Sequence, residues 1–303
     1  MQILRTPETR FANLPDFPYE PHYTNVPSGD GGTLRIAHVE AGPAGGPVVL
    51  MLHGEPSWSF LYRKMIPVFA AAGFRAVAPD LVGFGRSDKP ASPGDYSYQR
   101  HVDWMTAWLR ALDLRGVTLF CQDWGGLIGL RLVAENPERF ARVVAANTFL
   151  PTGDQPAGKA FDEWKHYALT TPTFDVGKIV VKGTARGFGP EVQAAYDAPY
   201  PDDTLKAGAR VFPTLVPVTP DDPAAPANRK AWEVLMKFDK PFLTTFGDSD
   251  KITRGGDLML QALIPGAKGQ PHTTIEKAGH FLQEDAGADI AGTVVKWLSA
   301  GAK

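Results

Sequence analysis

The sequence predicts an α/β protein in which helices cover both faces of a mainly parallel sheet. Short apolar runs rich in β-forming residues alternate with longer amphipathic runs, the order that crossover connections between parallel strands produce. This alternation stops between about residues 151 and 228, where proline, glycine and aromatic residues are frequent. We therefore expect residues 1–150 and 229–303 to form one core, and residues 151–228 to form a mainly helical cap inserted in it.

The expected elements of the core follow from this alternation. Strands are expected at Pro47–Leu52, Arg75–Ala78, Val117–Cys121, Val143–Ala146, Pro241–Phe246 and Thr273–Glu276. Helices are expected at Trp58–Ala72, Tyr98–Leu112, Gly126–Asn136, Asp257–Leu263 and Ala286–Leu298. An antiparallel pair near Tyr23–Pro27 and Leu34–Glu40, with glycines 31 and 32 as its turn, completes a sheet of about eight strands. The proline-rich stretch 213–226 is expected to be irregular, because proline interrupts helices and sheets.

Composition excludes several classes of partner. The 31 Lys and Arg residues nearly balance the 33 Asp and Glu residues, so no overall field attracts nucleic acid or an anionic membrane. Cys121 is the single cysteine, which rules out an intramolecular disulfide. The first residues lack the apolar stretch of a secretory signal, and no apolar run reaches membrane-spanning length. We expect a soluble cytoplasmic protein that acts on a small neutral molecule.

The most informative segment for chemistry is residues 117–129, where an apolar strand runs into a sharp turn and a helix opened by Gly125 and Gly126. In α/β-hydrolases such a turn carries the nucleophile, and it has room only for small neighbours. Asp123 is its central residue, and a carboxylate can displace a leaving group from saturated carbon without first losing a proton. Asp123 could instead simply cap the helix. Cys121 is interpreted as a small buried spacer rather than a nucleophile.

A base and an acid are expected in loops that follow later strands. His280 follows the last predicted strand and completes the chain order nucleophile, acid, histidine. His272 precedes that strand, at the opposite end of the sheet from a site built beyond the strand carboxyl ends. Asp248 and Asp250 both follow the strand predicted at 241–246. Either carboxylate could orient the imidazole and stabilise its charged form.

The loop after the strand predicted at 47–52 reads His-Gly-Glu-Pro over residues 53–56. In this fold that loop donates one backbone N–H to the oxyanion, and the residue after the nucleophile donates another. The expected donors are the amides of Glu55 and Trp124. His53 stands directly before the glycine and is expected to shape the loop rather than to act as a base.

With these motifs in place, the chain resembles the haloalkane dehalogenases, in the branch that binds the halide with two tryptophans. The resemblance runs through nearly the whole chain and is most specific in His-Gly-Glu-Pro at 53–56 and Gln-Asp-Trp-Gly-Gly at 122–126. The segment 80–90 is common to many α/β-hydrolases and says little about substrate. The resemblance implies that Asp250, rather than Asp248, is the acid that orients His280. Asp123, His280 and Asp250 would then form a relay of nucleophile, base and acid.

The resemblance also implies that Trp124 and Trp164 donate their indole N–H groups to the departing halide. Expelling an anion into an apolar pocket is costly unless donors meet it, and an indole is a donor on a rigid apolar ring. Another branch of the family uses an asparagine after His-Gly as its second halide donor. This chain has Glu55 at that position, so a tryptophan of the cap is needed as the second donor. The apolar residues implied to line the substrate pocket are Phe161, Leu127, Phe212, Pro213, Val216 and Ile252. These residues could equally be packing between cap and core.

The predicted activity is hydrolytic dehalogenation in two steps. Asp123 attacks the halogen-bearing carbon and forms an ester, and His280, oriented by Asp250, activates the water that hydrolyses the ester. No metal or organic cofactor is expected, and no cluster with metal-ligand spacing occurs in the sequence. The expected partners are a small apolar halogenated substrate, water and halide. We expect a monomer that binds neither nucleic acid nor membrane.

Three alternative functions share parts of this pattern. An epoxide hydrolase uses the same relay but needs acidic O–H donors, usually two cap tyrosines, and Tyr167, Tyr196 and Tyr200 lie in the predicted cap. A tryptophan directly after the nucleophile argues against it. A fluoroacetate-type dehalogenase would need arginines beside the nucleophile, where residues 124–126 offer none. A non-enzymatic small-molecule sensor could retain the scaffold, but it would need neither the relay nor the halide donors.

Overall fold

The computed structural model describes residues 1–300, and it has the mainly parallel sheet that the sequence predicts. Residues 301–303, the end of the predicted core range, lie outside the described residues. Within the described range, the strand order of the eight-stranded sheet is β10 (Thr273–Ile275), β9 (Phe242–Gly247), β8 (Phe140–Ala146), β7 (Val117–Gln122), β4 (Val48–Leu52), β5 (Arg75–Pro79), β3 (Thr33–Ala41) and β2 (His22–Pro27). Both pairings of β3 are antiparallel, and the other pairings of this sheet are parallel.

The predicted strands are all present, with small differences at their ends. The largest is at β8, which begins at Phe140 rather than at Val143. A separate antiparallel ribbon pairs β1 (Ile3–Leu4) with β6 (Lys89–Pro90). The sequence did not predict this ribbon, because strands of two residues are too short to show alternation.

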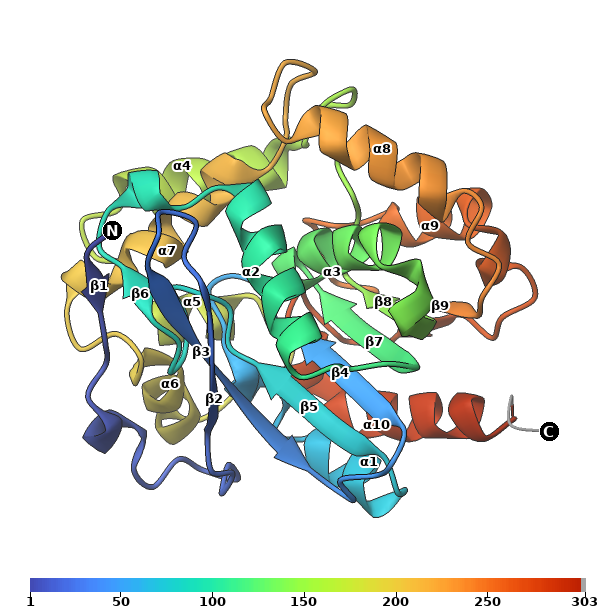
Figure 1. The fold of residues 1–303 in the computed structure, drawn as a ribbon, viewed down its shortest axis with the longest axis horizontal. Helices are drawn as coiled ribbons and strands as arrows, with labels where there is room; N and C mark the ends of the chain where they lie inside the picture. The colour runs from blue at the N-terminus through green and yellow to red at the C-terminus, as the bar shows by residue number, and fades with distance from the viewer. Residues whose placement is uncertain (301–303) are drawn as a thin grey trace.

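Helices cover both faces of the sheet (Figure 1). On one face α1 (Ile66–Ala71) packs against α10 (Leu282–Ala300), and on the other α3 (Trp124–Glu135) packs against α2 (Tyr98–Ala111) and α8 (Ala225–Leu235). A further helix, α9 (Gly256–Leu263), packs on β9. The sequence had not predicted α8, whose first turn contains a proline that is tolerated at that position.

The single helix predicted at 58–72 is wrong. The segment forms a 3-10 turn, η2 (Ser59–Tyr62), and then α1, which begins at Ile66. Pro67 at the start of α1 has no N–H to donate to the preceding turn, so the helical hydrogen bonds restart there. The last helix begins at Leu282, before the predicted Ala286, and Ala286 itself is non-helical with φ −146° and ψ 28°.

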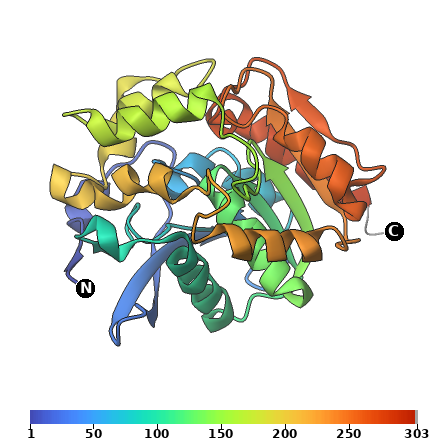
Figure 2. The same ribbon diagram turned by 90° about the horizontal axis from the view of Figure 1, so that it is seen from above.

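The segment between β8 and α8 is helical and lies to one side of the sheet. Its helices are α4 (Lys159–Thr170), α5 (Val176–Lys182), α6 (Pro190–Asp197) and α7 (Ala207–Val211), with short 3-10 turns η5 (Asp203–Lys206) and η6 (Phe212–Leu215). In both views these helices gather at the left of the molecule (Figures 1 and 2). The expected irregular stretch is shorter than predicted, since η6 extends to Leu215 and α8 begins at Ala225.

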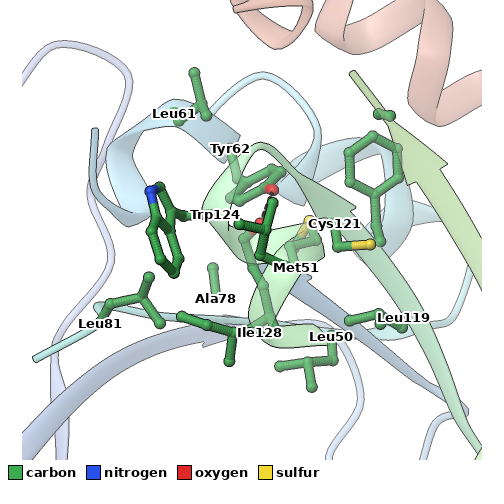
Figure 3. Packing of buried hydrophobic residues seen from close by; sticks show 14 of the residues in the cluster. Leu50, Met51, Leu61, Tyr62, Ala78, Leu81, Leu119, Cys121, Trp124 and Ile128 are labelled. Carbon is green, nitrogen blue, oxygen red and sulfur yellow. Dashed lines mark hydrogen bonds between the residues drawn. The ribbon is translucent and has the colours of Figure 1, made fainter. Parts of the chain in front are cut away.

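The turn after β7 depends on close packing between α3 and β4. Leu119 and Cys121 of β7 pack among Leu50 and Met51 of β4, with Trp124 in the same apolar cluster (Figure 3). A Cβ atom added to Gly125 would overlap the backbone carbonyl of Leu52 in β4. Only glycine therefore allows α3 to begin this close to the sheet.

Substitution of Gly125 by alanine is expected to destabilise the protein. The added methyl group meets the backbone of a buried strand, which cannot move aside as a flexible side chain would. We expect the free energy of unfolding, measured by urea denaturation, to fall by about 1–3 kcal/mol. The control is Gly292→Ala in α10, where the added atom meets open space and where helix propensity predicts a gain of about 0.5–1 kcal/mol. Equal effects of the two substitutions would contradict the close contact at Gly125.

Candidate active site

Asp123 occupies a strained turn between β7 and α3. Its backbone has φ 52° and ψ −128°, a region that non-glycine residues seldom adopt and that often marks functional sites. The backbone N–H of Asp123 donates to the carbonyl of Asn147 at 3.0 Å, and its carbonyl accepts from the hydroxyl of Thr148 at 2.8 Å. Its side chain makes no capping hydrogen bond to α3, so the helix-cap interpretation of this residue is wrong.

The structure brings the three predicted relay residues together at the carboxyl ends of the strands. One oxygen of Asp123 accepts a hydrogen bond from the backbone N–H of Glu55 at 2.8 Å, and the other lies 3.4 Å from His280 Nε2. His280 Nδ1 lies 3.2 Å from both carboxylate oxygens of Asp250. Asp250 is buried and also accepts from the backbone N–H of Ile252 at 2.9 Å.

The residues considered as alternatives for the acid and the base make contacts outside the relay. Asp248 is exposed and accepts from the neighbouring serine hydroxyl. The imidazole of His272 bonds to the backbone of Thr244 and Ala267, away from the relay. His53 lies 2.9 Å from the carbonyl of Gly54 and accepts from a backbone N–H at residue 81, which agrees with a loop-shaping role.

The electrostatics of the relay favour a charged imidazole in the resting site. Burial lowers the pKa of His280, but attraction to Asp250 and hydrogen bonds with Asp123 and Asp250 outweigh it and raise this pKa to about 10. Burial would raise the pKa of Asp250, yet attraction to His280 and hydrogen bonds to its carboxylate lower it. These interactions favour the protonated form of the His280 imidazole in the resting site.

Glu55 contributes its backbone to this site while its side chain is buried. One carboxyl oxygen of Glu55 has no hydrogen-bond partner within residues 1–300. Burial and the nearby charge of Asp123 raise the pKa of Glu55 well above its ordinary value, against opposing interactions with His280 and Trp164. The raised pKa favours the neutral form of Glu55, which adds no second negative charge beside Asp123.

A cavity of about 290 Å³ opens at Asp123, between the core loops and the helical segment 159–215. Its lining includes both predicted tryptophans and most of the predicted pocket residues, namely Leu127, Phe161, Pro213, Val216 and Ile252. Phe212 does not line this cavity. Its ring is fully buried behind Trp124, with the two ring centroids 4.6 Å apart. The sequence could not separate these positions, because which side of η6 faces the cavity is decided by how the segment docks.

Trp124 has an indole donor that the protein does not use. Its ring is 3% exposed and packs edge-on against Phe212 and Tyr98. No acceptor for its indole N–H is found within the described chain, residues 1–300. Four other tryptophans donate to protein oxygens, and these are Trp58, Trp104, Trp232 and Trp297. The buried Trp108 also lacks an acceptor, but it does not line the cavity.

Trp164 enters the cavity from α4. Its ring lies 5.9 Å from that of Tyr167 and 6.1 Å from that of Phe174, between centroids. Trp164 also interacts with the carboxyl group of Glu55. The two predicted halide donors therefore line one cavity, Trp124 from the start of α3 and Trp164 from α4.

Asn147 is a site residue that sequence analysis missed. Its side-chain amide donates to the carbonyls of Gly279 and His280 at 2.8 and 3.0 Å, and its side-chain oxygen accepts from Gly247 N at 2.9 Å. Its own carbonyl accepts from the N–H of Asp123, so Asn147 joins the loops that carry Asp123, Asp250 and His280. The sequence carries only a weak signal for this role. Asparagine tolerates the positive φ of 36° that Asn147 adopts, and Asn147 directly follows a predicted strand.

These features define an α/β-hydrolase that carries a carboxylate at the nucleophile turn. A family model described as the alpha/beta hydrolase fold matches residues 47–198. The strained turn, the relay at the strand carboxyl ends and the backbone donor from the loop after β4 are the parts that this fold uses for covalent hydrolysis.

Comparison with known proteins identifies the family more closely. The chain is 57% identical over 298 residues to a haloalkane dehalogenase of Psychrobacter cryohalolentis, covering 98% of each chain. It is 52% identical over 300 residues to one of Mycolicibacterium paratuberculosis, covering 99% of each. The haloalkane dehalogenase DpaA of Paraglaciecola agarilytica matches it with a TM-score of 0.89 and 37% identity, over 97% of each chain. The chain belongs to the haloalkane dehalogenase family.

The raised pKa of His280 predicts how stability depends on pH. A group whose pKa is higher in the folded state stabilises the protein fully below its unfolded pKa, about 6.5 for histidine. That contribution is lost as the pH rises through the folded pKa of about 10. Asp250→Asn removes the strongest attraction, so we expect lower stability at neutral pH and a smaller loss of stability between neutral pH and pH 10.

Urea unfolding at a series of pH values measures this effect. Asp248→Asn is the control, since it removes an exposed carboxylate from the same loop and should leave the pH dependence as in the wild type. Identical pH profiles for wild type and Asp250→Asn would contradict the assigned charge pairing.

Proposed function

We propose that this chain hydrolyses haloalkanes to an alcohol and a halide through a covalent ester on Asp123. The observation that carries the proposal is the pairing of a carboxylate on the nucleophile turn with the unused indole N–H of Trp124 in one apolar cavity. Membership of the haloalkane dehalogenase family supports it.

In the first step Asp123 attacks the carbon that bears the halogen. A carbon–oxygen bond forms as the carbon–halogen bond breaks, and the halide leaves with the bonding electrons. Trp124 and Trp164 donate their indole N–H groups to the developing anion, which would otherwise be costly to form in an apolar cavity.

In the second step His280 acts as the base. Once Asp123 is an ester it carries no charge, so the pKa of His280 falls and the imidazole releases its proton to solvent. The neutral imidazole takes a proton from water, and the hydroxide attacks the ester carbonyl. The backbone N–H groups of Glu55 and Trp124 stabilise the oxyanion. The intermediate expels an alkoxide, which takes a proton from His280 and leaves as the alcohol. The restored Asp123 carboxyl group passes its own proton to His280, which returns the site to its resting charge.

The alternative of an epoxide hydrolase lacks the second acid it needs. Of the three cap tyrosines, only Tyr167 lines the cavity. The hydroxyl of Tyr196 donates to Glu284, and Tyr200 is buried outside the lining. A single tyrosine does not provide the pair of donors that opens the ring, and the family relatives also favour the dehalogenase.

The substrate is proposed to be small and apolar, with water and halide as the other partners and no nucleic acid or membrane involved. The cavity wall is mostly apolar, and Lys182 and His280 are the basic residues that line it. We propose residues 151–228 as the cap and residues 1–150 and 229–303 as the core.

No helix in residues 1–300 could span a membrane. A monomeric, cytoplasmic protein remains our proposal, although DpaA is described as a tetramer.

The proposed covalent step predicts different behaviour for two relay variants. Asp123→Asn is expected to release no bromide from 1-bromobutane, because the nucleophile is gone. His280→Gln is expected to release one bromide per active site and then stop, because the ester cannot be hydrolysed. Bromide release and mass spectrometry of the quenched protein measure both outcomes.

A matched control and a second substrate make this test decisive. Asp248→Asn, an exposed carboxylate in the acid loop, should turn over as the wild type does. Styrene oxide should give no diol. Wild-type rates of bromide release by Asp123→Asn, or diol formation without bromide release by the wild type, would refute the proposed function.

The halide site predicts the effect of removing an indole donor while an aromatic ring is kept. Trp124→Phe and Trp164→Phe are each expected to slow bromide release by about 100-fold, because each removes one donor to a developing anion. Quenching of tryptophan fluorescence by added bromide should weaken as well. Trp297→Phe is the control, since its N–H donates to Gln270 outside the cavity. Unchanged rates in Trp164→Phe would remove Trp164 from the halide site.

A further inference from the structure

A contact between two loops links the cap to the catalytic base. The cap loop, residues 183–189 between α5 and α6, packs against the histidine loop, residues 276–281, which carries the base. The backbone N–H of Phe281 donates to the carbonyl of Gly183 at 3.2 Å. The guanidinium of Arg186 donates to two backbone carbonyls of the histidine loop, each at 3.3 Å.

The carboxylate of Asp285 lies at the centre of this contact. Asp285 belongs to the first turn of α10 and is 7% exposed. It accepts from the backbone N–H groups of Ala185 at 2.9 Å and Arg186 at 2.8 Å, both in the cap loop. It also accepts from the N–H of Gly279 at 2.8 Å, in the residue directly before His280.

These backbone donors account for the burial of the charge. Among the ion pairs found in residues 1–300 none includes Asp285, so backbone N–H groups from two separate loops satisfy its carboxylate. The loops meet so closely that a Cβ atom on Gly279 would overlap the backbone carbonyl of Gly183. Asp285 thus fixes the position of the histidine loop against the cap loop.

We propose that Asp285 is a positioning residue that holds His280 in register with Asp123 and Asp250. The contacts of His280 to those carboxylates, 3.4 Å and 3.2 Å, leave little room for displacement before they are lost. This proposal rests on the proposed function, in which His280 acts only in ester hydrolysis. Loss of the hydrogen bonds to Asp285 therefore slows the hydrolysis of the ester more than the release of halide.

Single-turnover rapid quench with 1-bromobutane and excess enzyme separates the two steps. Bromide formation follows the first step and butanol formation follows the second. For Asp285→Asn we expect butanol formation to slow by about 10- to 100-fold, the range that a small misplacement of a catalytic group produces, with bromide formation close to the wild-type rate. Asp285→Glu keeps the charge and should recover part of the loss.

The control is Asp289→Asn, which removes an exposed carboxylate from the same helix one turn later and should leave both rates unchanged. The proposal is overturned if Asp285→Asn forms butanol at the wild-type rate, or if it slows both steps by the same factor. Absence of bromide release by the wild type would instead overturn the proposed function, so the two failures are distinguishable.

Hydrogen exchange of the wild-type protein tests the same hydrogen bonds without a variant, in case Asp285→Asn does not fold. The amides of Ala185, Arg186 and Gly279 are expected to exchange slowly and to open together, because one carboxylate binds all three. Rapid exchange at Gly279, or opening of Gly279 independently of the other two, would overturn the proposal.

Discussion

The rest of the site depends on the backbone turn that projects the carboxylate of Asp123 into an apolar cavity. A positive φ at a non-glycine residue costs about 1–3 kcal/mol and persists only where the surroundings enforce it. Here the enforcement comes from Asn147 and Thr148, which bind the N–H and carbonyl of Asp123. Gly125 lets α3 start against the backbone of β4. Residues that follow the neighbouring strand β8, together with the close approach of α3 to β4, thus hold Asp123 in this turn.

Charge balance follows from this placement. The carboxylate of Asp123 is stabilised by a backbone N–H and by an imidazolium whose own charge is held by Asp250. The buried Glu55 would oppose this arrangement if it were ionised, but burial raises its pKa and so favours its neutral form. In the mechanism that we propose, formation of the ester removes the negative charge of Asp123, and His280 can then lose its proton and act as a base. The charge that the proposed first step removes is thus the charge that favours the protonated form of His280.

The first turn of α10 joins the helical segment 159–215 to this group of charges. Glu284 binds the guanidinium of Arg63 in the core and the hydroxyl of Tyr196 in α6. Asp285, the next residue, binds the cap loop and the residue before His280. Ala286 then leaves helical geometry, which sets this turn apart from the rest of α10. The element that follows the base therefore also anchors the segment that closes the cavity.

The sequence by itself determined the sheet, the turn and the order of the relay. Apolar runs predicted β4 and β7, and the glycines at 125 and 126 predicted the turn, because local packing and backbone strain restrict which residues such positions accept. The chain order of nucleophile, acid and histidine predicted His280. Only the tertiary structure decided that Phe212 packs behind Trp124, that residues 58–72 divide into two helices, and that Asn147 and Asp285 tie distant loops together. A side chain that bonds to the backbone of another loop leaves no periodic pattern, because its partner is set by how the chain folds back on itself.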